Sequence, residues 1–200
     1  MTGRLIAFEG GEAAGKSTQA KLLADRLGAL LTFEPGATDS GARIRSLVLD
    51  SPDLAPSPHT EALLMAADRA QHVAEVIRPA LDSGIHVVTD RFIGSSLAYQ
   101  GFGRHLGVED VLALSLFATG GLQSDLNVLL EVSEEVARSR QSSPGDRIEA
   151  ENADFHQRVL DGFRTLAQQD PERWVVIDGG RSVGEVADAV NAAVRDRLGV

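Results

Sequence analysis

The sequence contains no cysteine, which excludes disulfide bonds and thiolate metal sites and leaves the redox compartment undetermined. Its five histidines are scattered, and no two of them have the spacing of paired metal ligands. No N-terminal segment combines basic residues with a long apolar run, and no stretch of about eighteen apolar residues occurs. We therefore expect a cytoplasmic protein without a membrane partner.

The positive charge of the chain is limited and is carried almost entirely by arginine. The formal net charge is −10, which argues against a broad surface for nucleic acid or anionic lipid. Any phosphate site must therefore be a local concentration of basic side chains. Lys16 and Lys21 are the only lysines in the sequence. A lysine in such a chain indicates a position where a compact ammonium sits among phosphates.

Residues 10–17 read Gly-Gly-Glu-Ala-Ala-Gly-Lys-Ser, which is the G-x-x-x-x-G-K-S pattern of a phosphate-binding P-loop. The glycines let successive backbone N–H groups point at phosphate oxygens, Lys16 reaches the β- and γ-phosphates, and Ser17 offers its hydroxyl to Mg²⁺. The helix expected over 17–27 adds its N-terminal dipole. The residues expected to contact a nucleoside triphosphate are Gly10, Gly11, Glu12, Ala13, Ala14, Gly15, Lys16, Ser17 and Thr18.

Short apolar runs alternate with helical patterns along the chain. The runs that predict strands are 5–8, 29–33, 85–89, 126–132 and 175–177. The periodic stretches that predict helices are 17–27, 40–50, 59–83, 108–119, 133–142, 151–169 and 183–198. This alternation is typical of a three-layer α/β fold with a five-stranded, mostly parallel sheet and helices on both faces. With no internal repeat, residues 1–200 are predicted to form a single domain.

Three local signals refine this prediction. Ser57 and Pro58 have the residue types of an N-cap and a first helical position, so a helix is expected to begin there. Ser182 and Glu185 have the spacing of a capping box that opens the last helix. Residues 141–145, Gln-Ser-Ser-Pro-Gly, are predicted to be the most mobile segment.

In open α/β sheets, ligands bind beyond the carboxyl ends of the strands. The second predicted strand ends at Glu34, and the third ends at Asp90 and Arg91. Asp90 is expected to hold a magnesium ion or its waters. Two alternatives remain open: Asp90 caps a helix, or Glu131 supplies the acid, although Glu131 lies inside its strand pattern.

Arg69 falls on an apolar helical stripe between Met65 and Val73. An arginine on a buried face needs a partner, because leaving it unpaired costs several kcal/mol. The sequence leaves two partners open, an internal salt bridge or a polar ligand that enters the cleft. Asp68 is adjacent in sequence but is expected to point away from Arg69.

Further motifs make the pattern more specific. Residues 32–38 read Thr-Phe-Glu-Pro-Gly-Ala-Thr, residues 90–101 read Asp-Arg-Phe-Ile-Gly-Ser-Ser-Leu-Ala-Tyr-Gln-Gly, and residues 146–149 read Asp-Arg-Ile-Glu. Together with the P-loop and the Ala-Asp-Arg-Ala of 67–70, they resemble the motifs of thymidylate kinases over nearly the whole chain. The run over 90–101 is highly specific for that family, whereas a P-loop alone fits many functions.

The resemblance implies transfer of the γ-phosphoryl group of ATP to dTMP, which gives dTDP and ADP on the path to dTTP. It implies the cofactors ATP and Mg²⁺, with Ser17 and Asp90 at the metal, and a homodimer that binds no nucleic acid. It also implies a short lid at about 138–150 over a P-loop sheet.

By position, the resemblance assigns the acceptor contacts. Arg45 and Arg91 resemble the arginines that hold the acceptor phosphate, and Arg69 resembles the arginine that hydrogen-bonds a thymine carbonyl. Tyr99 resembles the ring that crowds the 2′ position of the sugar, and Glu12 resembles the P-loop acid that contacts the 3′-hydroxyl.

The base contacts include one departure from the family pattern. Gln100, with Ser95 and Ser96, resembles the residues that hold the base edge, and Glu34 is expected to contact the substrate as well. Met65 stands where the family has a phenylalanine that stacks on thymine. Ala37 replaces a glycine, which matters only if that position needs a positive φ.

The chemistry of such a transfer needs no general base, because a phosphate oxygen is already ionised at neutral pH. Arginines must hold the acceptor, while Lys16 and Mg²⁺ hold the donor. Since the P-loop contains no arginine, the arginine of the transition state is expected from the lid, where Arg138, Arg140 and Arg147 lie; Arg147 is favoured because it falls within the matched 146–149. The expected catalytic residues are Lys16, Asp90, Arg91, Arg140 and Arg147.

Two rival functions share parts of the pattern. A deoxynucleoside kinase would have the P-loop and the Asp-Arg pair, but its hydroxyl acceptor would need a base, which Glu34 could supply. A P-loop switch or GTPase would need a guanine-reading N-K-x-D, and neither lysine follows an asparagine.

Overall fold

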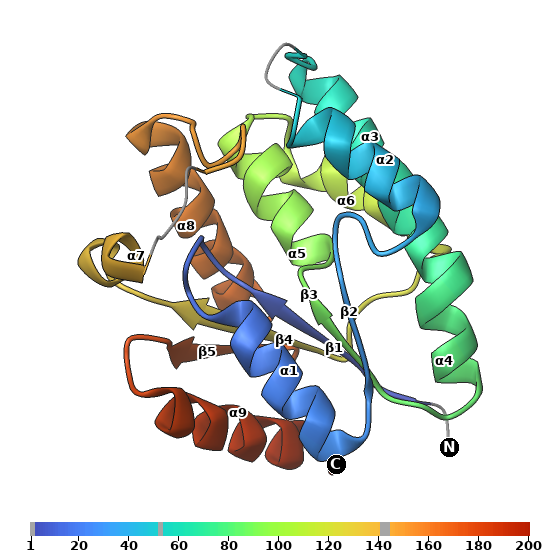
Figure 1. Cartoon of the computed structure of the whole chain (residues 1–200), viewed down its shortest axis with the longest axis vertical. Coiled ribbons are helices and arrows are strands. Elements are labelled where there is room, and N and C mark those ends of the chain that lie inside the picture. Colours follow the sequence, from blue (N-terminus) through green and yellow to red (C-terminus); the bar gives the residue numbers. More distant parts are fainter. Residues whose placement is uncertain (1–2, 52–53, 141–144) are drawn as a thin grey trace.

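The computed structural model describes residues 3–51, 54–140 and 145–200. Within these residues, five strands form one sheet: β1 Leu5–Glu9, β2 Leu30–Phe33, β3 Val87–Asp90, β4 Leu126–Glu131 and β5 Trp174–Asp178. Their order is β2-β3-β1-β4-β5, and every pair is parallel (Figure 1). The predicted α/β sheet is confirmed, and each strand lies within two residues of its predicted bounds.

The helices fill the intervals between the strands. They are α1 Lys16–Leu27, α2 Asp39–Val48, α3 Pro58–His72, α4 Arg78–Asp82, α5 Ile93–Ser96, α6 Val108–Thr119, α7 Glu134–Arg140, α8 Ala153–Gln169 and α9 Val183–Leu198, with π-helical segments η1 Val73–Ile77 and η2 Leu97–Gly103. The predicted helix 59–83 is therefore α3, η1 and α4 in succession. The α5–η2 segment was not predicted, because its glycines and serines are weak helix formers. Burial of this segment holds it in helical form.

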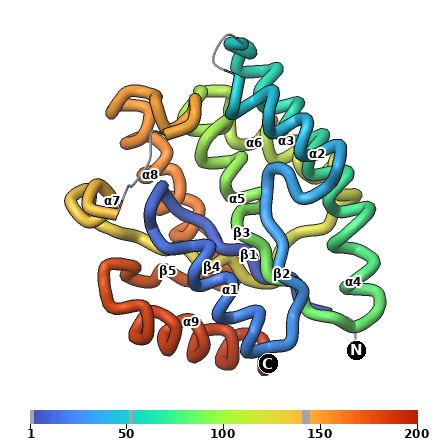
Figure 2. Tube along the Cα trace, viewed as in Figure 1, coloured from blue at the N-terminus to red at the C-terminus, as the bar shows by residue number. Residues whose placement is uncertain are grey.

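The two faces of the sheet are covered by different helices. In β1, Ile6 and Phe8 pack with residues of α1 and α9, while Leu5 and Ala7 pack with residues of η1, η2 and α8. Figure 2 shows α1 and α9 side by side. Alternation of side chains along a strand produces these two sets. Both faces are thereby buried, as a parallel sheet requires.

The helix starts confirm two predictions. Ser57 accepts a hydrogen bond from the Thr60 N–H with Pro58 at the first helical position, and Ser182 and Glu185 form both bonds of the capping box. The positive φ of the 32–38 motif belongs to Gly36, at 114°, so the position of Ala37 does not need a glycine.

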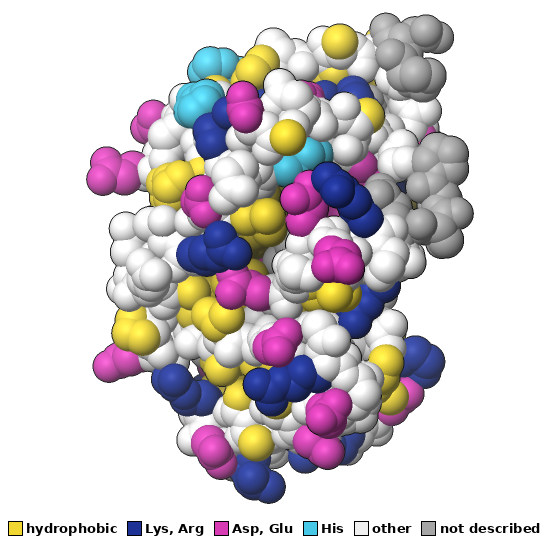
Figure 3. Space-filling model, turned by 90° about the vertical axis from the view of Figure 1, so that its left-hand side faces the viewer, with side chains coloured by type: hydrophobic (Ala, Val, Ile, Leu, Met, Phe, Trp, Pro, Cys, Tyr) yellow, Lys and Arg dark blue, Asp and Glu magenta, His cyan; other side chains and the backbone are white. Residues whose placement is uncertain are grey.

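Two further expectations concern the surface. Of the segment predicted to be mobile, residues 141–144 lie outside the described residues. Within the described residues, no helix combines the length and apolar character needed to cross a membrane. Acidic and basic side chains are interspersed on the face shown in Figure 3.

Candidate active site

Two adjoining cavities open at the carboxyl edge of the sheet. The first, here called the P-loop cavity, is lined by residues that include Lys16, Ser17, Arg45, Asp90 and Arg140. The second, here called the α3 cavity, is lined by residues that include Met65, Asp68, Arg69, Ser96, Tyr99 and Gln100. Glu12, Glu34 and Arg91 line both. The site therefore lies where the strand-end rule predicts it.

The P-loop folds around its own lysine. Gly10 has φ 135°, and a Cβ there would lie 2.4 Å from the Leu130 carbonyl oxygen, so only glycine fits. Gly15 has φ 92° and caps α1. Lys16 is 7% exposed, and its Nζ donates to the Gly11 carbonyl at 2.6 Å. Burial, together with the nearby Arg91, lowers the pKa of Lys16 to about 8.

Asp90 ends β3 beside the start of α1. Ser17 Oγ donates to Asp90 Oδ2 at 2.5 Å. Among the described residues, the buried Asp90 Oδ1 has no hydrogen-bond partner. Asp90 does not cap a helix, since Phe92 is the N-cap of α5. Glu131, the rival acid, is held by Arg164 at 2.7 Å. A buried carboxylate oxygen that lacks a donor is a group that a hard cation can satisfy.

Arg91 lies at the junction of the two cavities with φ 71°. Its Nη1 donates to the Gly10 carbonyl and to Ser95 Oγ, each at 3.1 Å, and its Nη2 pairs with Glu12. Tyr99 also donates to Glu12, at 2.8 Å. Burial opposes ionisation of Glu12, but Arg91 and Lys16 outweigh it and hold its pKa at about 2. Glu12 is thus a carboxylate whose charge offsets part of that of Arg91.

Glu9 contacts the residues that surround Arg91, and the sequence did not predict a role for it in the site. It is fully buried and accepts from the Phe92 N–H at 3.1 Å and from Ser95 Oγ at 2.6 Å. Burial raises the pKa of Glu9. Because Ser95 in turn accepts from Arg91, Glu9 helps to fix that arginine. An acidic residue at the end of an apolar strand was the available signal.

Arg69 has an internal partner, the first of the two that the sequence left open. Its Nε donates to Glu34 Oε2 at 2.9 Å, and both side chains are 3% exposed. Its Nη2 donates to Ser96 and to the Phe92 carbonyl. The other Glu34 oxygen lies 2.9 Å from His72 Nδ1. Arg69 is therefore fixed in the wall of the α3 cavity.

Asp68 lies beside this pair. Its Oδ1 accepts from the Gly36 N–H at 2.9 Å, while among the described residues its buried Oδ2 has no partner. Burial and the adjacent Glu34 raise the pKa of Asp68 to about 6. The sequence predicted no role for this carboxyl in the site.

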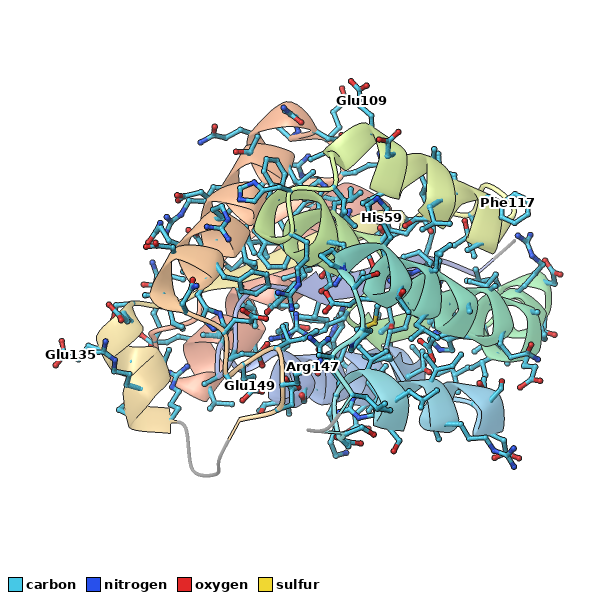
Figure 4. The ribbon with its side chains drawn as sticks, turned by 90° about the horizontal axis from the view of Figure 1, so that it is seen from above. His59, Glu109, Phe117, Glu135, Arg147 and Glu149 are labelled. Carbon is cyan, nitrogen blue, oxygen red and sulfur yellow. The ribbon has the colours of Figure 1, made fainter. Side chains whose placement is uncertain are left out.

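The three candidate lid arginines occupy different places. Arg140, on α7, lines the P-loop cavity and donates to the Gly179 carbonyl at 3.0 Å. Arg147 lies toward the middle of the molecule (Figure 4), where it donates to the Val48 carbonyl and pairs with Glu61. Arg138 pairs with Glu134 on the surface. Of the three, Arg140 is the one the structure brings to the P-loop.

Glu61 is a second residue that the sequence missed. It is fully buried and accepts hydrogen bonds from Gln100, Arg104 and Arg147. Glu61 lies four residues before Met65, on the stripe that carries Arg69, so a charge on an apolar face was the signal here as well. Met65 is half-buried and lines the α3 cavity with Gln100.

Comparison with known proteins agrees with these motifs. The family model for thymidylate kinase matches residues 8–190. A thymidylate kinase of Lactobacillus helveticus (strain DPC 4571) is 43% identical over 99% of this chain and 98% of its own length. One of Synechococcus sp. (strain JA-3-3Ab) is 47% identical over 96% of each chain.

Similarity in structure extends over the same length. The crystal structure of thymidylate kinase from Ehrlichia chaffeensis superposes with a TM-score of 0.80 at 28% identity, covering 98% of this chain and 99% of that one. The P-loop fold is thus confirmed along with the sequence match. On these grounds the chain belongs to the thymidylate kinase family.

Proposed function

We propose that this chain transfers the γ-phosphoryl group of ATP to dTMP, with Mg²⁺ as cofactor, and releases dTDP and ADP. Membership of the thymidylate kinase family gives the reaction class, ATP-dependent phosphoryl transfer to a nucleoside monophosphate. The observation that supports two nucleotides bound together is the pair of cavities that share Glu12, Glu34 and Arg91. ATP places its phosphates in the P-loop cavity, and dTMP places its base in the α3 cavity.

The donor side fits a magnesium nucleotide. Ser17 and Asp90 supply hydroxyl and carboxylate oxygens, the ligands that Mg²⁺ prefers, and the orphaned Asp90 Oδ1 is open to a bound water or the ion. Bound Mg²⁺ neutralises charge on the β- and γ-phosphates. Lys16 holds the same phosphates as an ammonium, and their negative charge raises its pKa when ATP binds.

The acceptor side holds a phosphate at one end and a base at the other. Arg91, with Arg45 across the P-loop cavity, binds the phosphate of dTMP. Arg69 and Gln100 contact the base edge, and Met65 lies against the base. Tyr99, held by Glu12, limits the space beside the sugar.

Catalysis follows from alignment and charge neutralisation. The attacking phosphate oxygen is ionised at neutral pH, so the site needs arginines rather than a base. Arg91 draws the acceptor phosphate toward the P-loop, and Arg140 neutralises charge on the group in transfer. Arg147, which Glu61 holds, acts on the acceptor side.

The rival reading, a deoxynucleoside kinase, requires a base at Glu34. Each Glu34 oxygen is occupied, one by Arg69 and the other by His72. A carboxylate held in this way is a poor proton acceptor for a sugar hydroxyl, because protonation would break an ion pair. The family match also favours a monophosphate as the acceptor.

The test is ADP release measured with dTMP, thymidine, AMP and GMP as acceptors, with and without Mg²⁺. We expect dTMP to be by far the best acceptor and the rate to vanish when a chelator removes the metal. Faster turnover of thymidine, or ADP release that is indifferent to dTMP, would refute the proposal.

We also propose, from the family resemblance, a single domain with a lid at about 138–150 that works as a homodimer in the cytoplasm. Phe117, at the periphery of α6, is 88% exposed, and such an apolar side chain is suited to a protein contact (Figure 4). Light scattering on the purified chain at micromolar concentration tests the dimer. The mass of a monomer at that concentration would refute the proposed homodimer.

A further inference from the structure

Glu61 is the centre of a buried polar cluster that includes Gln100, a residue that lines the α3 cavity. Gln100 Nε2 donates to Glu61 Oε1 at 2.9 Å, and Arg104 Nε donates to the same oxygen at 3.1 Å. Glu61 Oε2 accepts from Arg104 at 3.0 Å and from Arg147. Burial would favour the neutral acid, but the donors Arg104, Arg147 and Gln100 together lower the pKa of Glu61. Glu61 is therefore an ionised carboxylate.

An ionised carboxylate accepts hydrogen bonds and donates none. The Gln100 amide group must therefore turn its NH₂ toward Glu61. Oε1 is the amide atom left for the α3 cavity, which Gln100 lines. Gln100 is 2% exposed, so its amide has little other freedom.

We propose that Glu61 is a positioning residue that fixes Gln100 with its carbonyl oxygen toward the α3 cavity, so that the site selects a base whose facing ring nitrogen carries a hydrogen. This inference rests on the proposed function. Thymine presents N3–H, a donor that matches Gln100 Oε1. Cytosine presents an unprotonated N3, an acceptor that meets another acceptor there. Since the Gln100 amide can turn over once Glu61 no longer fixes it, the part of the choice between the two bases that Gln100 makes depends on Glu61.

The matched comparison uses two Glu-to-Gln changes in one cluster. Glu61→Gln replaces an acceptor by a group that both donates and accepts, so the Gln100 amide can present either end to the base. Glu151→Gln makes the same change at the carboxylate that binds Arg104 on its other side, at 2.6 Å, without contact to Gln100. The readout is kcat and KM for dTMP and for dCMP, together with the KM for ATP and thermal unfolding.

For Glu61→Gln we expect the preference for dTMP over dCMP, as a ratio of kcat/KM, to fall about tenfold, since one hydrogen bond in the site is no longer fixed. We expect the KM values of the acceptor nucleotides to change and the KM of ATP to stay constant. Glu151→Gln keeps the preference of the parent protein. A preference that Glu61→Gln does not alter, or that both variants lower equally, overturns the proposal.

Two further variants keep the test decisive if Glu61→Gln proves unstable. Glu61→Asp retains the charge near the arginines but draws it back from Gln100, and we expect the same loss of preference. The double variant with Glu61→Gln and Gln100→Glu exchanges the two side chains. It places an acceptor-only carboxylate at the base and should restore most of the preference for dTMP. A Glu61→Asp protein with full preference contradicts the proposal, as does an exchange variant that resembles Glu61→Gln. Failure of the parent protein to use dTMP would instead refute the proposed function.

Discussion

The two cavities differ in what their charged side chains contact. In the P-loop cavity the cations donate to backbone carbonyls: Lys16 to Gly11, Arg45 to Pro35, Arg91 to Gly10 and Arg140 to Gly179. In the wall of the α3 cavity the charges pair with each other, as Arg69 does with Glu34. Behind Gln100, which lines this cavity, Arg147 pairs with Glu61 in the same way.

This difference matches the ligands that each cavity would bind. A carbonyl holds a cation in place without cancelling its charge, so Lys16, Arg45 and Arg140 keep their charge for phosphates in the P-loop cavity. An ion pair has little net charge but fixes the direction of its hydrogen bonds, which suits the edge of an uncharged base. Arg91 belongs to both groups, because it contacts the Gly10 carbonyl and also pairs with Glu12.

The largest effect is expected where the two cavities meet. Arg91→Ala removes the cation from both, and we predict a fall in kcat/KM for dTMP on the order of 10³, as for loss of a donor to a charged transition state. Steady-state kinetics measure it, with ADP binding and thermal unfolding as controls for the fold. A loss below tenfold would mean that the junction does not hold the phosphate.

Substitutions of two lid arginines should affect different kinetic constants and so distinguish the two cavities. Arg140→Ala should lower kcat by about 10² and leave the KM of dTMP almost constant, because Arg140 lines the P-loop cavity, where we propose that the phosphoryl group is transferred. Arg147→Ala should act mainly on the KM of dTMP, because Arg147 contacts Glu61. Parallel kinetics of the two variants test the division. The reverse pattern would restore the assignment of Arg147 to the transition state that the 146–149 motif favoured.

Asp68 tests whether an ionised carboxylate in the wall of the α3 cavity lowers the free energy of unfolding. Its pKa of about 6 lies above the ordinary carboxyl value, so the folded protein binds this proton more tightly than the unfolded chain does. The contribution of Asp68 to stability therefore falls as pH rises from about 4 to about 6 and stays low above that. Asp68→Asn, whose Oδ1 can still accept from Gly36, should gain about 1–3 kcal/mol at pH 7 and almost nothing near pH 4.

Denaturant unfolding of both proteins across this pH range measures the difference. Glu109→Gln, at an exposed carboxyl on α6 (Figure 4), is the control and should show no such dependence. A pH-independent difference between Asp68→Asn and the parent protein would show that the pKa of Asp68 is the same in the folded and unfolded states.

The smallest expected effect lies at the wall of the α3 cavity. Met65 lines it beside Arg69 and has no flat face to offer a base. Met65→Phe should tighten dTMP by about 0.5–1.5 kcal/mol, the usual gain of an aromatic pair, with kcat almost constant. Calorimetry with dTMP measures the gain. Weaker binding by a folded variant would show that Met65 serves packing alone.

The same comparison explains how much the sequence could predict. The sheet followed from apolar runs and the P-loop from its spacing, because each depends on neighbours in the chain. Asp90 and Arg91 followed from the rule that sites form where strands end. The ion pairs in and behind the wall of the α3 cavity join residues far apart in sequence, such as Glu61 with Arg147 and Glu34 with His72, and no local pattern pairs them.

Two features of the structure show the physical limit of what a sequence predicts. The α5–η2 segment is helical because it is buried, and its glycines and serines give no helical period. The structure brings Arg140 rather than Arg147 to the P-loop, which depends on the direction of α7 and of the chain after it. Arg69 was identified because it is a charged residue on an apolar helical stripe. The same criterion applied to Glu61 would have indicated a second buried ion pair, which the structure shows between Glu61 and Arg147.

Direct transfer between the two cavities can be measured by following the γ-phosphate of ATP itself. With label in that group, we predict that Mg²⁺, dTMP and the protein yield dTDP that carries the label in its terminal phosphate, while thymidine yields almost no labelled dTMP. Label found in dTMP formed from thymidine, or released as inorganic phosphate whether or not dTMP is present, would contradict direct transfer between the two cavities.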